Sequence, residues 1–133
     1  MILPDTSAWV EYFRASGSPV HGAMVRALSE DFDVVTTGIV VMELLAGETS
    51  ETDVATTRSL LVEYPMIPVH AAQDFEHAAK IYRTCRAAGD TVRQLTDCLI
   101  AVAAIKAGAT VLHADRDFDA IARHSDLRIQ PTA

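Results

Sequence analysis

The sequence predicts an α/β domain of three layers, α/β/α, with a short-stranded and mostly parallel central sheet. Two observations carry this prediction. Short apolar runs typical of buried strands alternate with longer segments of helical periodicity. The chain has 133 residues, of which 50% are hydrophobic, so it is long enough to bury one core and too short for two ordinary domains. We therefore expect a single domain over residues 1–133.

Five stretches are expected to form strands. The first is the apolar run that opens the chain and stops at Asp5. The others are residues 33–36, 66–69, 110–113 and 127–129. Pro68 favours an edge or a strand end for the third stretch, because proline donates no hydrogen bond to a neighbouring strand.

Seven stretches between these strands are expected to be helical: residues 9–13, 20–28, 39–46, 51–64, 73–88, 95–107 and 115–123. Thr6 or Ser7 would cap the first helix, since a side-chain hydroxyl can accept a free amide at a helix start. Pro19 suits the first position of the second helix. Glycines that would end the third, fifth and sixth helices are Gly47, Gly89 and Gly108.

Charge and cysteine usage narrow the class of protein. The net charge of −7 argues against holding nucleic acid by bulk charge and suits acids gathered around a cation. No apolar run is long enough to span a membrane, and the first residues do not resemble a signal peptide. Cys85 and Cys98 lie in helix-like segments, which is typical of reduced core cysteines and fits a cytoplasmic protein.

Four acids stand in apolar surroundings. Asp5 and Asp115 follow expected strand ends, whereas Glu43 is the only charge in residues 39–46 and Asp97 is the only charge in residues 95–105. Burying such a carboxylate is costly unless a basic partner, helix-terminal amides or a metal compensates it. Taken singly, each acid is more often a helix cap or half of a buried ion pair.

Taken together, the acids indicate a cation site. Positions at the carboxyl ends of parallel strands meet at one edge of a sheet. Four carboxylates, or five with Asp117, cannot all stay ionised there without cations. Oxygen ligands alone suit Mg²⁺ or Mn²⁺, which activate water and stabilise charge on a phosphoryl group. Phosphodiester hydrolysis is therefore the leading chemistry.

The same acids lie in stretches that resemble a known family. The four acidic motifs of PIN-domain ribonucleases, most closely those of VapC-type toxins of bacterial toxin–antitoxin pairs, are similar in order and spacing to four stretches here. These are Met-Ile-Leu-Pro-Asp5-Thr-Ser-Ala-Trp, Val-Val-Met-Glu43-Leu-Leu-Ala-Gly, Thr-Asp97-Cys-Leu-Ile-Ala and His-Ala-Asp115-Arg-Asp117-Phe. One departure is Pro4, which stands where the family usually has an aliphatic residue and which removes a donor from a central strand.

The resemblance implies a PIN-like fold and an Mg²⁺- or Mn²⁺-dependent endoribonuclease that cuts RNA and blocks translation. It also implies a homodimer, silenced by a cognate VapB-type antitoxin whose tail enters the acidic groove. Thr6 would orient the first acid or a bound water. The implied catalytic metal ligands are Asp5, Glu43, Asp97 and Asp115, with Asp117 as a fifth acid acting directly or through water.

Two arginines are candidates for substrate binding. Arg93 lies in the loop before the Asp97 helix, and Arg116 lies between two site acids. Each either reaches an RNA phosphate or pairs with a site acid. His113 is expected close to the acids in a structural role. An aromatic stripe on the first helix either packs in the core or forms a partner surface; it consists of Trp9, Tyr12 and Phe13.

Two other functions compete with the nuclease. A signalling receiver domain would need a lysine at a late strand end, and neither Lys80 nor Lys106 is so placed. A catalytically silent PIN-like domain that acts by protein binding is the other alternative, and missing site acids would favour it.

Overall fold

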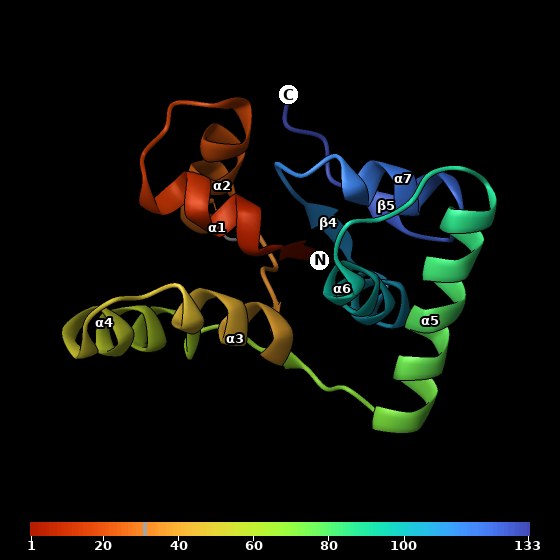
Figure 1. The fold of residues 1–133 in the computed structure, drawn as a ribbon. Helices are drawn as coiled ribbons and strands as arrows, with labels where there is room; N and C mark the ends of the chain where they lie inside the picture. Colours follow the sequence, from red (N-terminus) through yellow and green to blue (C-terminus); the bar gives the residue numbers. More distant parts are fainter. Residues whose placement is uncertain (31) are drawn as a thin grey trace.

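The computed structural model describes residues 1–30 and 32–133, which form seven helices and five short strands (Figure 1). The strands are β1 (Ile2–Pro4), β2 (Thr36–Thr37), β3 (Met66–Ile67), β4 (Thr110–Leu112) and β5 (Arg128–Ile129). The helices are α1 (Thr6–Phe13), α2 (Pro19–Ser29), α3 (Gly38–Ala46), α4 (Glu51–Leu61), α5 (Ala71–Ala87), α6 (Leu95–Ala107) and α7 (Asp117–Arg123).

The strands pair in parallel throughout the described residues: β1 with β4, β4 with β5, and β2 with β3. A single parallel bridge between Ile2 and Val34 joins the two sets, giving the order β3-β2-β1-β4-β5. The chain continues from β1 toward one edge of the sheet and from β4 toward the other. In open α/β sheets, ligands bind at the carboxyl ends of the two strands where the order reverses in this way.

Pro4 accounts for the single bridge. The Ile2 amide donates to the Asp33 carbonyl at 2.8 Å, and the Ile2 carbonyl accepts the Val35 amide at 2.9 Å. The next backbone nitrogen on that side of β1 belongs to Pro4, which has no N–H to donate. On the other side β1 pairs regularly with β4, so the irregularity expected of Pro4 affects only the side facing β2.

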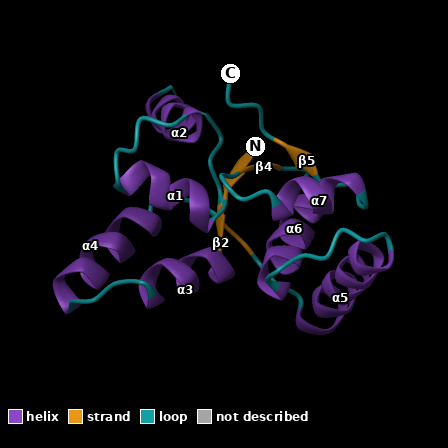
Figure 2. Ribbon diagram, turned by 45° about the horizontal axis from the view of Figure 1, so that its top comes forward, coloured by secondary structure: helices purple, strands orange, loops and turns teal. Residues whose placement is uncertain are grey.

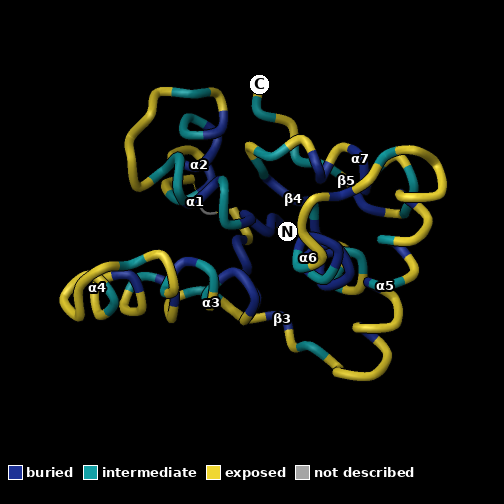
Figure 3. Tube along the Cα trace, in the orientation of Figure 1, coloured by how far each residue is buried: buried dark blue, intermediate teal, exposed yellow. Residues whose placement is uncertain are grey.

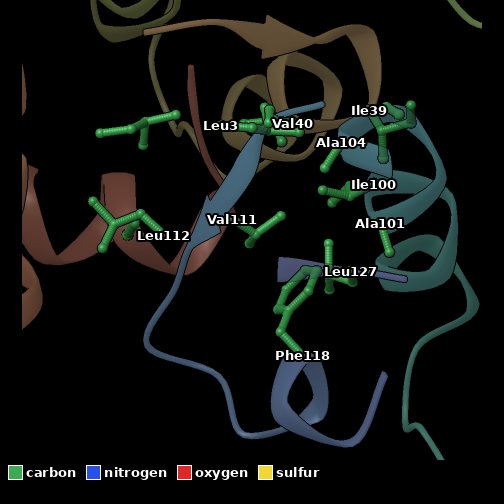
Figure 4. Close-up of a cluster of buried hydrophobic side chains, with 14 of the residues drawn as sticks. Leu3, Ile39, Val40, Ile100, Ala101, Ala104, Val111, Leu112, Phe118 and Leu127 are labelled. Atoms are coloured by element: carbon green, nitrogen blue, oxygen red, sulfur yellow. The ribbon is translucent and has the colours of Figure 1, made fainter. Parts of the chain in front are cut away.

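Helices cover both faces of the sheet, as the sequence predicts. Figure 2 shows the strands running between α1–α4 on one side and α5–α7 on the other. Figure 3 shows that α6 is largely buried, whereas α4 and α5 are exposed over much of their length. Leu3 and Val111 of the strands pack with Ile100 of α6 and Phe118 of α7 in the core (Figure 4).

Several expected boundaries are wrong by one to three residues, and three of them lie near the site acids. The helix expected over residues 9–13 begins at Thr6, because Asp5 itself is the N-cap and accepts the Ala8 amide. The strand expected at 33–36 is β2, which begins three residues later and ends one residue later. The last helix begins at Asp117 instead of Asp115, whose carboxylate accepts the Asp117 amide and so caps the helix from outside.

Several other expectations are confirmed. Pro19 occupies the first position of α2, and Gly108 ends α6 in the left-handed conformation at φ 69°. Both cysteines are buried and free. Trp9 is fully buried, whereas Phe13 at the other end of the aromatic stripe is exposed. Within the described ranges, no helix combines the length and apolarity that crossing a membrane requires.

Candidate active site

Four segments bring their acids to the carboxyl ends of β1 and β4. Asp5 follows β1, Asp115 follows β4, Glu43 comes from α3, and Asp97 lies in the first turn of α6. All four line one pocket of about 620 Å³. The other residues lining this pocket are Thr6, Ser7, Val10, Glu11, Arg14, Ala46, Gln94 and Ala114.

Asp5 is held by the start of α1. It is only 3% exposed, and its carboxylate accepts the Ala8 amide at 3.0 Å and the Ser7 hydroxyl at 2.7 Å. Burial raises the pKa of Asp5 from 3.8 to about 6, against the opposing effect of these two hydrogen bonds. Ser7 in turn accepts the Ala114 amide at 2.8 Å, so it joins α1 to the loop after β4.

Glu43 is held by hydroxyl groups. The Thr6 hydroxyl donates to Glu43 Oε1 at 2.7 Å, and the Thr96 hydroxyl lies 3.5 Å from Oε2. Thr6 was expected to orient Asp5 or a bound water, and in the structure its hydroxyl contacts Glu43 and not Asp5. Because Asp5 is the N-cap, the first hydroxyl of α1 faces α3, and the second one, from Ser7, turns back to the aspartate.

Asp97 is the least compensated acid of the site. It is 6% exposed, and its Oδ2 atom is buried without a hydrogen-bond partner among the described residues. Burial raises the pKa of Asp97 from 3.8 to about 7, and the negative charges of Asp115, Asp5 and Glu43 contribute. An unpartnered carboxylate oxygen among other carboxylates fits a hard divalent cation, since Mg²⁺ and Mn²⁺ prefer oxygen ligands.

Asp117 lies beside this pocket and is paired with Arg93. One oxygen each of Asp97, Asp115 and Asp117 lie within 4.8 Å of one another. Arg93 Nε donates to Asp117 Oδ2 at 3.0 Å, and Arg93 Nη2 donates to Asp115 Oδ1 at 2.8 Å. Of the two roles open to Arg93 from the sequence, the structure shows the pairing with site acids.

Arg116 and His113 differ in their surroundings. Arg116 is exposed, and its side chain forms no hydrogen bond or ion pair with any other residue that the structure describes. It lines a neighbouring pocket of about 340 Å³ together with Arg93. His113 Nδ1 accepts the Asp115 amide at 3.0 Å, and its Nε2 lies 3.1 Å from Asp119. These contacts shape the loop after β4, in line with the structural role expected of His113.

Two residues of the site were missed from the sequence. Ser7 orients Asp5, and an acid followed two residues later by serine at a helix start was a usable signal for that contact. Arg14 lines the acidic pocket at the C-cap of α1. A single arginine after an aromatic helix has no pattern that separates it from an ordinary surface residue.

The chain is similar to known proteins in both sequence and fold. The family model described as PIN domain matches residues 2–124. A VapC ribonuclease of Mycobacterium bovis and ribonuclease VapC11 of Mycobacterium tuberculosis are each 46% identical to this chain over 129 residues, which cover 96% of this chain and 96% of each relative. A chain of VapBC-1 from nontypeable Haemophilus influenzae has the same fold, with a TM-score of 0.76 over 99% of this chain and 98% of that chain at 20% identity.

The receiver alternative is not supported by these matches, and the acids expected of a nuclease are all present at one end of the sheet. The family match spans every acidic motif, and the likeness to VapC ribonucleases covers nearly the whole of both chains. The chain therefore belongs to the PIN-domain family, in its VapC branch.

Proposed function

We propose that this chain is a single-domain, Mg²⁺- or Mn²⁺-dependent endoribonuclease toxin that hydrolyses RNA phosphodiesters in the cytoplasm and thereby inhibits translation. The observation that carries the proposal is the buried Asp97 Oδ2 atom, which has no partner among the described residues and faces other acids. The VapC ribonucleases that are 46% identical to this chain support RNA as the substrate.

The proposed ligands of the cation are Asp5, Glu43, Asp97 and Asp115, with Asp117 beside them. When bound, the ion supplies a Lewis acid that lowers the pKa of water and stabilises charge on the phosphoryl oxygens.

The chain's own residues position these acids. Ser7 and the Ala8 amide fix the carboxylate of Asp5, and Thr6 fixes Glu43. Arg14 lines the acidic pocket and Arg116 lines the neighbouring one, and both are exposed. They are therefore placed to bind backbone phosphates of an RNA that enters the site.

Cleavage of total cellular RNA by the purified, antitoxin-free protein tests this function. We expect discrete cuts with Mg²⁺ or Mn²⁺ that disappear with EDTA and in Asp5→Asn. Asp126→Asn is the matched control, because Asp126 is exposed and lines neither pocket of the site. Cuts that survive Asp5→Asn would show a contaminating nuclease. Metal binding without any cuts would favour the catalytically silent, partner-binding alternative.

We also propose a VapB-type antitoxin as the partner, with a basic tail that enters the acidic pocket. The fold shared with a VapBC complex and the four carboxylates of the pocket support this proposal. Adding the cognate antitoxin should abolish RNA cleavage once one antitoxin tail is present for each toxin chain. Tight binding that leaves cleavage intact would contradict inhibition at the pocket.

A homodimer is the proposed state of the free toxin. Several large apolar side chains are exposed on the single chain, among them Phe13, Met42 and Val62. Light scattering coupled to gel filtration should give twice the chain mass of 14.4 kDa. A mass of one chain at micromolar concentration would contradict the dimer.

A further inference from the structure

The five carboxylates of the site divide into two groups by the charge of their partners. Asp115 and Asp117, here called the paired acids, both accept hydrogen bonds from Arg93. Asp5, Glu43 and Asp97, here called the open acids, accept hydrogen bonds only from neutral groups or, at Asp97 Oδ2, from none. Among the described residues, no basic side chain forms an ion pair with an open acid.

Arg93 and the Asp117 amide together saturate one oxygen of each paired acid. Asp117 Oδ2 accepts both the Arg93 amide, at 3.1 Å, and Arg93 Nε, at 3.0 Å. Asp115 Oδ1 accepts Arg93 Nη2 at 2.8 Å and the Asp117 amide at 3.0 Å. A carboxylate oxygen has about two lone-pair directions, so neither atom has one left for a metal. Each paired acid keeps only its other oxygen for a cation.

From these contacts we propose that Arg93 takes the place of a second cation, so that the acid site binds one divalent ion per chain. Two-metal sites hold their ions about 3.5–4 Å apart between shared carboxylates. At this site the guanidinium bridges Asp115 and Asp117, as a second cation between shared carboxylates would. The other oxygens of the paired acids, together with Asp97, would then hold a single ion. This inference rests on the proposed divalent-metal dependence.

The position of Arg93 is fixed by more than its ion pairs. Asp117 is only 4% exposed, so its charge needs a permanent partner, and a guanidinium stays charged at all ordinary pH values. The loop that carries Arg93 is held to α7 a second time, since Asp90 accepts Arg123 Nε at 3.1 Å and lies 2.8 Å from His124 Nε2. Arg93 therefore cannot release the paired acids by losing its proton, and its backbone is held in place.

Counting bound Mn²⁺ tests the inference without reference to RNA cleavage. Free Mn²⁺ is followed by electron paramagnetic resonance while the ion is titrated into the purified, antitoxin-free chain. We expect one bound ion for the wild type and two for Arg93→Gln, which removes the charge and keeps most of the side chain. Arg93→Lys restores a positive charge and should bind one.

Arg58→Gln is the matched control. Arg58 is an exposed arginine in the last turn of α4 and lines neither pocket of the site, so this variant removes the same charge away from the acid cluster. One bound ion is expected for this variant. Two ions on Arg58→Gln, or only one on Arg93→Gln, would overturn the role assigned to Arg93.

The wild type supplies a second readout that requires no variant to fold. Loaded with excess Mn²⁺, it should give the spectrum of an isolated ion, and a spin-coupled pair of ions would overturn the inference. These results separate the two proposals. An RNA that is not cut leaves a count of one ion intact, whereas a wild type that binds no Mn²⁺ contradicts both the inference and the metal dependence of the proposed function.

Discussion

The hydroxyl of Ser7 lies 2.7 Å from Asp5 Oδ1 and 2.9 Å from Asp5 Oδ2, so it serves both oxygens of the first acid. The same hydroxyl accepts the Ala114 amide. Ser7 therefore fixes the direction of its proton toward Asp5 and ties the end of β1 to the loop that follows β4.

Replacing Ser7 by alanine should weaken metal binding and raise the pKa of Asp5 above its value of about 6, because the lost hydrogen bond favours the charged carboxylate. Losing a group that orients a metal ligand typically costs about 10–100-fold in metal affinity or activity. The Mg²⁺ concentration for half-maximal RNA cleavage, measured at several pH values, checks this. Ser7→Thr keeps the hydroxyl and should retain most of the affinity. An unchanged Mg²⁺ requirement in Ser7→Ala would contradict the assigned role.

Two threonines offer a graded test of how Glu43 is positioned. Thr6 donates to Glu43 at 2.7 Å and Thr96 at 3.5 Å, so the first hydrogen bond is the stronger one. We expect Thr6→Val to lower kcat by roughly tenfold or more. Thr96→Val, which removes the same atom at the longer distance, should lower it less. Single-turnover cleavage of a defined RNA measures both variants, and the reverse order of effects would refute this account.

The metal-free protein should lose stability as the pH rises from about 4 to about 7. The folded-state pKa values of Asp5 and Asp97 are raised from 3.8 to about 6 and about 7, mainly by burial. The folded state therefore binds these protons more tightly than the unfolded state, and the stability gained from them is lost as the two acids ionise. Asp74 and Asp90 have lowered pKa values, so their opposite contribution falls below this range.

Urea unfolding in EDTA across this pH range measures the effect. Adding Mg²⁺ near neutral pH should restore the lost free energy of unfolding, because the ion binds only the folded site. A free energy of unfolding that climbs steadily with pH in EDTA would be inconsistent with buried, uncompensated acids.

Asp97→Asn should stabilise the metal-free protein while removing its response to metal. Leaving a buried polar group without a hydrogen-bond partner typically costs about 1–3 kcal/mol, and more for a charged group. The substitution removes the charge of a carboxylate with such an oxygen, Asp97 Oδ2. Thermal unfolding near neutral pH should show a higher Tm than wild type in EDTA and little further increase with Mn²⁺. Asp126→Asn, at an exposed position, should leave both values unchanged. A lower Tm for Asp97→Asn in EDTA would mean that Asp97 is compensated in some other way.

Asp5, Glu43 and Asp97 could be predicted from the sequence because each one ends or interrupts an apolar segment. Asp5 ends a strand, and Asp97 is the only charge at the start of a helix that is buried along most of its length. Buried strands and helices contain apolar residues at regular intervals, so a charged residue within such a segment can be recognised in the sequence. The parallel strand arrangement then placed these acids at one end of the sheet.

The partners of the acids were less predictable, because they depend on side-chain directions and on loops. Arg93 and Asp117 are 24 positions apart, and nothing local distinguishes an arginine that pairs with an acid from one that binds RNA. Thr6 and Ser7 are neighbours, and which hydroxyl serves Asp5 depends on the residue at which α1 begins.

The bridge between Ile2 and Val34 is the only pairing between the two sets of strands among the described residues. Asp5 and Asp115 follow β1 and β4, which pair regularly with each other. Glu43 lies in α3, which follows β2 in the other set of strands. Pro4 donates no backbone hydrogen bond toward β2. The hydrogen bonds from the Thr6 and Thr96 hydroxyls therefore connect Glu43 to α1 and α6. The distance between Glu43 and the other carboxylates thus depends on these side-chain contacts. Substitutions at Thr6 or Thr96 can change that distance without altering the sheet.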